Sequence, residues 1–412
     1  MRKFVHLAAA AALAVAISTP ATAQDVAIRG AQVHTMAGPP IENGVVVSRG
    51  GRIAAVGPAA TTPVPENLEV IEAAIVTPGL VDARSVVGLS GFLNQPDDQD
   101  QLEESAPMQP QLRAIDAYNP DERLVAWLRG LGITTIHTGH GPGALISGQT
   151  MVAKTVGNTA DEAAIVPAAM VAANLGEWAL ANGGKSPGKR AKQIALLRAA
   201  LLAAKTPDTP VKGGKDAKDG ESGNKPAGLD TQVLRDVLAR KLPLMVTAHH
   251  AQDIMSALRL KEEFGIDLVI DGASEAYLLL GQLRDADVRL ILHPTMARQY
   301  GELQNASFTT SGVLREAGVS FALQSGFEGY VPKTRVVLWE AAIAAANGLA
   351  WQDALASVTI DAARIIGVGQ RVGSLEVGKD GDVAMFDGDP FEYTSHVTGV
   401  VIDGKVVSRT PQ

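Results

Sequence analysis

Apolar and polar residues alternate at both ends of the chain, and a period of two is typical of β-strands with one buried face. Aspartate followed by glycine at 403–404 adds a tight-turn signal between two such stretches. We therefore predict that the two ends of the chain meet in one small β-sandwich. The alternating stretches are VAIRGAQVHT (26–35), GVVVSRGGRIAAVG (44–57), GDVAMFDGD (381–389) and VTGVVIDGKVV (397–407).

The middle of the chain instead repeats an amphipathic helical pattern followed by a short apolar run. Repeats of this length favour parallel strands joined by right-handed helical crossovers. The number of units fits a (β/α)8 TIM-type barrel better than an open sheet, so we predict an α/β fold. The strand-like runs are ITTIHTG (133–139), LPLMVTAHH (242–250), IDLVIDG (266–272), VRLILHPT (288–295) and VSFALQSG (319–326), and two longer helical patterns, 334–348 and 351–367, close the series.

The first 23 residues resemble an export signal. Arg2 and Lys3 precede an apolar run, and Ala21-Thr22-Ala23 supplies small residues at a cleavage position. The run is short for a bilayer span and ends in polar residues, so we predict cleavage after Ala23 and a periplasmic or secreted protein without a membrane span. Removing the peptide takes away two cations and no anions, so the net charge of −8 becomes −10.

Composition narrows the classes of partner and metal site. An acidic chain has no general attraction for phosphate backbones, so nucleic-acid binding is disfavoured. With no cysteine, a metal would need histidine, carboxylate or modified lysine ligands. Residues 205–230 are rich in Gly, Pro, Lys and Asp, which predicts a disordered insertion. The predicted organisation is a signal peptide at 1–23, a composite β-sandwich from 24–77 and 366–412, and a barrel over 78–365 that carries this insertion.

Polar residues gather where the predicted strands end. In a barrel of this kind the carboxyl ends of the strands hold the functional side chains, so these residues are the pocket candidates. Histidines in such places also cap loops and bond to backbone carbonyls, and this explanation is the simpler one for any single histidine. The candidates are Arg84, His137, His140, Lys154, Thr247, His249, His250, Asp271, His293 and Gln324.

Two stretches carry a family resemblance: VTPGLVDA (76–83) and the long block from GVGQRVGSL to DGKVV (367–407). They resemble the amidohydrolase superfamily, particularly its imidazolonepropionase-like exported bacterial branch, and GALISGQTMVAKT (143–155) is similar to that branch as well. The resemblance extends over nearly the whole chain after the signal. It implies a (β/α)8 barrel with a β-sandwich, and hydrolysis of non-peptide C–N bonds by water activated on one or two divalent metals.

The resemblance also implies ligand positions, and this chain departs from them. The usual His-x-His pair of the first strand falls on Arg84 and Val86, and the fifth-, sixth- and eighth-strand positions fall on Thr247, Asp271 and Gly326. Lys154 alone could take the family's bridging role. A guanidinium cannot ligate, and at about 4 Å it would repel each unit of positive charge by roughly 4 kcal/mol at an effective dielectric near 20.

Three functional hypotheses follow, with a scaffold or assembly protein as a fourth. The first is a pseudoenzyme or binding protein without a cofactor, in which Arg84 contacts Asp271 directly or through water and a small anionic molecule is bound. The second is a hydrolase with a relocated site for zinc or another divalent metal. The third is metal-free chemistry using His and Asp as acid and base. The oligomeric state and the ligand are left open, and the weak candidates for relocated ligands are His137, His140, His249, His250, Asp271 and His293.

Overall fold

The structure is a computed structural model that describes residues 25–93, 95–180, 186–206, 227–297, 300–326 and 336–411. The predicted signal peptide and most of the predicted insertion lie outside the described residues. No helix among those described is long and apolar enough to cross a membrane.

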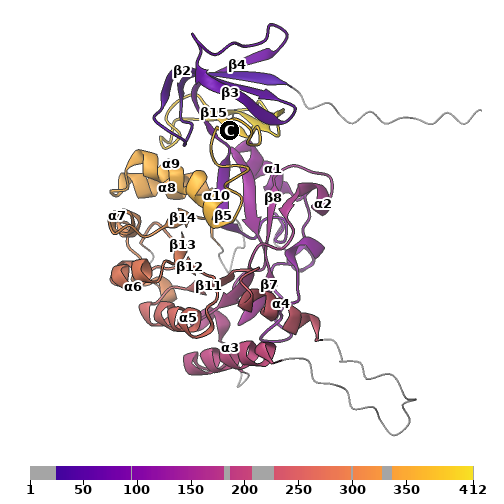
Figure 1. The fold of residues 1–412 in the computed structure, drawn as a ribbon, viewed down its shortest axis with the longest axis vertical. Coiled ribbons are helices and arrows are strands. Elements are labelled where there is room, and N and C mark those ends of the chain that lie inside the picture. The colour runs from indigo at the N-terminus through magenta and orange to yellow at the C-terminus, as the bar shows by residue number, and fades with distance from the viewer. Residues whose placement is uncertain are drawn as a thin grey trace, which may run out of the picture.

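Both ends of the chain contribute strands to one seven-stranded sheet, in the order β17-β16-β15-β4-β1-β2-β3. Strand β4 pairs with β1 in parallel and with β15 in antiparallel fashion, which joins the N-terminal strands to the C-terminal ones (Figure 1). The description of this unit as a sandwich, with the boundaries given above, remains a prediction. Its strands are β1 Val26–Val33, β2 Ile41–Arg49, β3 Arg52–Pro58, β4 Glu69–Pro78, β15 Val383–Phe386, β16 Val397–Ile402 and β17 Lys405–Ser408.

The middle of the chain has the mixed α/β content of a TIM-barrel-type fold. Its strands form a four-stranded sheet, β5-β6-β8-β9, and a six-stranded sheet, β14-β13-β12-β11-β10-β7. All neighbours from β10 to β14 pair in parallel. The strands are β5 Leu80–Ser85, β6 Ile133–Thr138, β7 Ile146–Gln149, β8 Met151–Lys154, β9 Ala164–Val166, β10 Val171–Asn174, β11 Leu244–Ala248, β12 Leu268–Gly272, β13 Arg289–Leu292 and β14 Phe321–Leu323.

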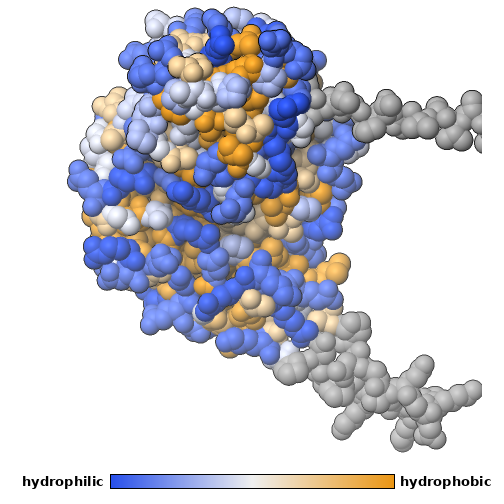
Figure 2. Space-filling view, turned by 45° about the horizontal axis from the view of Figure 1, so that its top comes forward, coloured by the Kyte–Doolittle hydropathy of each residue, from blue (hydrophilic) through white to orange (hydrophobic). Residues whose placement is uncertain are grey.

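Helices cover the outside of these strands, and Figure 1 shows α5 to α9 following one another along one side. They are α1 Arg123–Gly130, α2 Ala160–Ala163, α3 Arg190–Lys205, α4 Leu229–Leu238, α5 Ala251–Phe264, α6 Leu280–Asp285, α7 Thr310–Glu316, α8 Val337–Ala346, α9 Trp351–Ser357 and α10 Ile360–Ile365. Five short 3-10 helices complete the described elements: η1 Pro96–Asp98, η2 Ala114–Asp116, η3 Gly176–Ala179, η4 Ala276–Leu278 and η5 Gly301–Leu303. Hydrophilic residues cover much of the face in Figure 2, with smaller apolar patches between them.

The alternation of side chains along each strand builds two apolar layers. One set of strand residues packs against the helices, including Val246, Ile270 and Leu290. The residues between them form a separate inner cluster, to which the strands contribute Val81, Val152, Met245, Val269, Ile291 and Ala322. Because successive side chains point to opposite faces, the inward series continues toward the carboxyl ends of the strands. We call that end of the barrel the mouth and the opposite end the base.

One strand direction differs from the prediction. Strand β7 pairs antiparallel with β10, and β8 pairs antiparallel with β6, so this segment runs against its neighbours. The carboxyl end of β8 therefore lies at the base. The expectation that Lys154 belongs to the mouth, where we had placed it as a pocket or bridging residue, is corrected by this reversal.

Strands β5 and β14 face each other across a seam between the two sheets. The carboxylate of Asp82 in β5 accepts hydrogen bonds from the backbone N–H (3.0 Å) and hydroxyl (2.5 Å) of Ser325, which follows β14. The N–H of Val81 donates to the carbonyl of Val358, between α9 and α10, at 2.8 Å. The seam is thus bridged by side-chain and loop hydrogen bonds.

Candidate functional site

A small polar cavity lies at the mouth. Thr247, Asp271, His293 and Gln324 reach it because each stands two residues beyond an inward apolar residue of its strand. About 30 Å³ of this cavity is open to the centre of a molecule of the size of water. Its lining is Arg84, Ser85, Val86, Pro142, Trp178, Thr247, His249, Asp271, Gly272, His293, Gln324 and Gly326.

Arg84 is a buried cation in this lining, with 5% of its surface exposed. The pairing of β5 with β6 shifts between Asp82 and Ser85, and Arg84 lies in that irregular stretch. Its guanidinium donates to the carbonyl of Ser85 at 2.8 Å and to the carbonyl of His140. Burial lowers the pKa of Arg84, and the negative charges of Asp271 and Asp82 oppose that shift.

Asp271 faces the same cavity but is held by neutral donors. One carboxylate oxygen accepts from the hydroxyl of Thr247 at 2.6 Å, and the other accepts from the amide of Gln324 at 2.5 Å. Of the predicted contact with Arg84, direct or through water, the direct form is absent among the described residues. The guanidinium bonds to backbone carbonyls instead, and the charge of Asp271 still acts on it.

Asp82 is a second buried carboxyl group close to Arg84. Burial raises its pKa from 3.8 to about 7, although the hydrogen bonds from Ser325 and Arg84 favour the charged form. Sequence reasoning treated Asp82 only as part of a family motif. Its position after an apolar strand start carried no signal of its burial in the seam.

The imidazole rings of His249 and His293 each pack against a glycine, Gly272 and Gly326, at the place where any other residue would have its Cβ. A Cβ on Gly272 would lie 2.5 Å from the ring of His249, and a Cβ on Gly326 would lie 2.4 Å from the ring of His293. His249 Nδ1 is hydrogen-bonded to the hydroxyl of Ser274 at 2.7 Å, and burial lowers the pKa of His249 to about 4. His293 Nδ1 is buried without a partner in the described structure.

The other candidate histidines are outside the cavity lining. His137 uses both ring nitrogens, with the carbonyl of Ala83 at 2.7 Å and the hydroxyl of Thr150 at 2.6 Å. Both ring nitrogens of His140 are buried without a partner among the described residues. Burial, and then the charge of Arg84, lower the pKa of each to about 4. His250 pairs with Glu275 at 2.9 Å.

Lys154 lies in an ion cluster at the base. Its Nζ contacts carboxylate oxygens of Asp382 at 2.5 Å, Asp380 at 3.1 Å and Asp403 at 3.1 Å. Burial opposes the shift, yet these three charges raise the pKa of Lys154. The cluster connects the barrel to the C-terminal strands of the seven-stranded sheet.

The donor groups at the mouth do not fit a metal ion. In the described ranges, no three His, Asp or Glu side chains converge in a way that could hold one. Both oxygens of Asp271 and one nitrogen of His249 are engaged by protein partners, and Arg84 adds a fixed positive charge. Neither the standard position nor the relocated candidates provide a ligand set here.

Sequence reasoning missed Trp178 and Pro142, which also line the cavity. Trp178 belongs to η3, the turn after β10, and Pro142 follows β6. Neither stands directly at a strand end, and a tryptophan in a loop has no motif that would mark it. Only knowledge of which strand precedes each loop could have found them.

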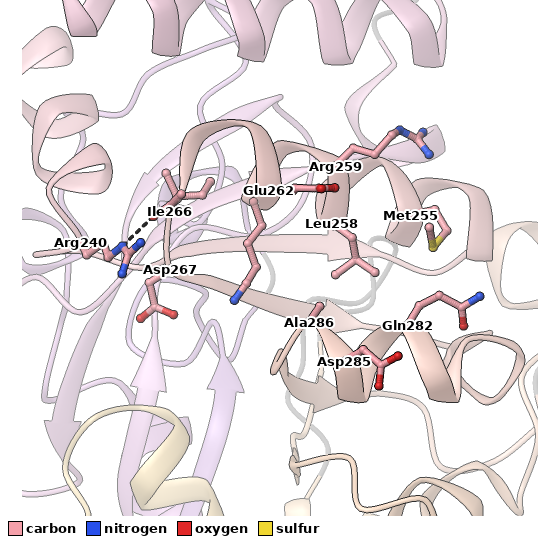
Figure 3. A pocket seen from close by; sticks show the side chains of 12 residues that line it. Arg240, Met255, Leu258, Arg259, Glu262, Ile266, Asp267, Gln282, Asp285 and Ala286 are labelled. Atoms are coloured by element: carbon pink, nitrogen blue, oxygen red, sulfur yellow. Dashed lines mark hydrogen bonds between the residues drawn. The ribbon is translucent and has the colours of Figure 1, made fainter.

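A larger hollow of about 770 Å³ lies on the outside of the barrel between α5 and α6 (Figure 3). Arg240 stands beside Asp267 at one end of the view, and Gln282 and Asp285 stand at the other. Arg240 donates to the carbonyl of Gly265 at 2.6 Å, so this cation satisfies the C-terminal end of α5. The lining of this hollow shares no residue with the lining of the mouth cavity, and Arg240 has a structural role in it.

Comparisons with known proteins agree on one family. The sequence matches the model of the Amidohydrolase family over residues 307–407. A curated relative, "Amidohydrolase tasK" of Hapsidospora irregularis, is 41% identical over 68 residues, which are 16% of this chain and 7% of that protein. The chain therefore spans only a small part of the length of this relative.

Solved structures match over nearly the whole chain. An amidohydrolase from Thermotoga maritima MSB8 has a TM-score of 0.83 and 26% identity, over 93% of this chain and all of that one. A protein from Bifidobacterium longum described as a "putative prolidase" has a TM-score of 0.56 and 18% identity, over 95% of this chain and 96% of that one. An adenosine deaminase from Xanthomonas campestris with bound zinc has a TM-score of 0.52 and 16% identity, over 93% of this chain and 92% of that one. The last two similarities concern the fold alone.

Proposed function

We propose that this chain, a member of the amidohydrolase superfamily, is a metal-free pseudoenzyme. Other members of that superfamily typically bind a divalent metal. The observation that carries the proposal is the buried guanidinium of Arg84 at the mouth. The negative charges of the buried residues Asp271 and Asp82 act on it. A fixed positive charge of this kind opposes a metal at the same place.

The charge balance of the cavity supports the same conclusion. Arg84 and Asp271 have opposite charges, and the raised pKa of Asp82 favours its neutral form below pH 7. His249, with its pKa lowered to about 4, is neutral at pH 7. The protein thus supplies its own counter-charges, and no described group offers the free carboxylate that would take a proton from attacking water.

Metal content tests the proposal. Protein purified from its native compartment without chelators or metal-affinity resin should contain far less than one zinc, iron, nickel or manganese per chain by mass spectrometry. Chelator should leave its melting temperature unchanged, since a metal that binds only the folded state would stabilise it. About one metal per chain, lost in both Asp271→Asn and His249→Ala, would favour the relocated metal site instead.

A second candidate function is binding of a small anionic molecule at the mouth. One observation favours it: Arg84 lines the cavity and its guanidinium uses two of its N–H groups on carbonyls. A carboxylate as small as formate could accept from the remaining N–H groups. We expect formate to bind the wild-type protein in a calorimetric titration and not to bind Arg84→Gln.

Several finer features belong to the same proposal. These are the imidazolonepropionase-like branch, a closed barrel with a β-sandwich, and export to the periplasm after cleavage behind Ala23. The motifs 76–83 and 367–407 support the first two, and the N-terminal pattern supports the last. Fractionation of cells followed by N-terminal sequencing tests export, with Gln24 expected as the first residue of the exported protein.

A further inference from the structure

The turn that carries Trp178 contributes this residue to the lining of the mouth cavity. It follows β10 as η3, Gly176–Ala179, and Trp178 is half-buried there. The same lining contains Arg84 and residues at the ends of the strands. Only about 30 Å³ of the cavity is open to the centre of a water-sized molecule, so the position of this turn affects how large a molecule can enter.

Buried polar side chains hold the backbone of the turn on both sides. The N–H of Gly176 donates to Gln193 at 3.1 Å, and the amide of Gln193 donates to the carbonyl of Gly176 at 2.7 Å. The N–H of Glu177 donates to the carboxylate of Glu302 at 2.6 Å. Gln193 comes from α3 and Glu302 from η5, so the turn is fixed by parts of the chain far from it in sequence.

Glycine at 176 makes this close approach possible. Its φ of +76° lies in the left-handed region, and a Cβ there would stand 2.0 Å from Glu302 Oε1. The carboxylate can therefore reach the backbone only because residue 176 has no side chain.

An ion pair in turn holds Glu302. Arg190 of α3 donates to Glu302 at 3.0 Å and to Asp253 of α5 at 3.0 Å. Glu302 is 4% exposed and Asp253 is 3% exposed, so neither carboxylate is free to move into solvent. We call Gln193, Glu302, Arg190 and Asp253 the anchor of the turn.

We infer that Trp178 is the specificity-determining residue of the mouth cavity and that the anchor is what positions it. In this arrangement the cavity admits molecules about as large as water or formate and excludes larger ones. The inference rests on the proposed function, because it concerns the same cavity. It adds the residue that sets the size of the ligand.

Chemical modification of histidine tests the inference without a known ligand. Diethyl pyrocarbonate acylates an accessible neutral imidazole, and His249 and His293 both line the cavity. Peptide mass spectrometry gives the rate at each histidine. His396, whose side chain is 54% exposed, is the reactive reference, and fully buried His137 reports any unfolding.

In Trp178→Ala we expect His249 and His293 to react about tenfold faster relative to His396, because the indole is removed from the lining and exposure no longer waits for local opening. Gly176→Ala should give a smaller increase, since its Cβ displaces Glu302. Trp339→Ala is the matched control: this tryptophan of α8 is 58% exposed and is not in the lining, so no change is expected.

Unchanged rates at His249 and His293 in Trp178→Ala, with His137 still unreactive, would overturn the inference. A calorimetric arm separates this from failure of the proposed ligand class. Formate should bind both proteins, whereas benzoate should bind only Trp178→Ala. If neither anion binds while the modification rates rise as expected, anion binding is wrong and the role of Trp178 stands.

Discussion

Two buried cations, Arg84 at the mouth and Lys154 at the base, have opposite kinds of surroundings. Lys154 touches three carboxylates directly, at 2.5 to 3.1 Å. Arg84 donates to backbone carbonyls and faces Asp271 across a cavity, without an ion pair among the described contacts. Each cation is 5% or less exposed, so burial alone does not distinguish them.

The surroundings of Lys154 and Arg84 differ in whether the buried polar groups have hydrogen-bond or ion-pair partners. At the base, burial opposes the shift, but Lys154 and Arg371 together lower the pKa of Asp380. At the mouth, His293 Nδ1 is buried without a partner among the described residues, and Arg84 lines the same cavity. A paired cluster that joins two sheets is typical of structural ion networks, whereas unsatisfied buried groups beside a cavity are typical of a binding site.

Lys154→Met is expected to have the largest effect. It leaves Asp382 buried without its cation, while Asp380 keeps its ion pair with Arg371. Breaking one side of a buried ion pair costs about 3–5 kcal/mol of unfolding free energy. Urea unfolding followed by circular dichroism measures the loss.

Two further variants separate the buried cluster from charge in general. Adding Asp382→Asn to Lys154→Met should recover part of the loss, because it removes an unpaired charge. Lys241→Met breaks an exposed pair with Asp236 and should cost less than about 1 kcal/mol. If Lys154→Met were no worse than Lys241→Met, the base cluster would not be the structural element of this comparison.

The contrast between the two cations also shows what the sequence could and could not predict. Apolar periodicity predicted β6 and β11 to β14 and placed Thr247, Asp271, His293 and Gln324 at one end of β11 to β14, because alternation fixes which residues point inward. The same apolar pattern has no direction. Nothing in MVAK shows that β8 runs antiparallel, and so Lys154 was assigned to the wrong end.

Contacts between distant segments also could not be predicted from the sequence, because they depend on how the elements pack. His137 and His140 stand at a strand end as predicted, yet tertiary hydrogen bonds turn His137 toward Ala83 and Thr150. The anchor of the Trp178 turn combines residues from α3, α5 and η5. Such convergence depends on how the elements pack, which local patterns do not encode.

The second prediction concerns how the unfolding free energy depends on pH, and its expected size is intermediate. The folded pKa of His140 is about 4 against an ordinary 6.5, so the folded state binds fewer protons between these values. Stability is therefore lost as pH falls from 6.5 toward 4, by at most about 1.4 kcal/mol per pH unit for one such group. His140→Gln should make the fall in unfolding free energy over that window shallower.

Asp82→Asn should act in the opposite direction. Its folded pKa, about 7 against 3.8, means that the folded state binds more protons between these values, so Asp82 contributes stability that is lost as pH rises toward 7. Replacing Asp82 by Asn should therefore make the unfolding free energy fall more steeply as the pH decreases from 7 to 4. Urea titrations at intervals from pH 4 to 7 give both slopes, and equal slopes in the two variants would contradict the assigned burial at the mouth.

The smallest change is expected when two histidines are restored on β5, because this substitution should not create a zinc site. Arg84→His with Val86→His restores two imidazoles on β5 and removes the guanidinium, yet we expect no stoichiometric zinc. Structural zinc usually takes four ligands and catalytic zinc three plus water. The fifth-strand position is still Thr247, both oxygens of Asp271 are bonded, and the ring of His293 fills the side-chain space of Gly326.

Adding Thr247→His to that double variant is the informative comparison. It supplies a third imidazole and frees one oxygen of Asp271, so zinc binding should begin with this substitution if the donor set is what the mouth lacks. Calorimetric titration with zinc, after circular dichroism has established that each variant is folded, measures the difference. One zinc bound per chain in the double variant would mean that Arg84 alone kept the metal out, and the altered strand ends would then be secondary to its charge.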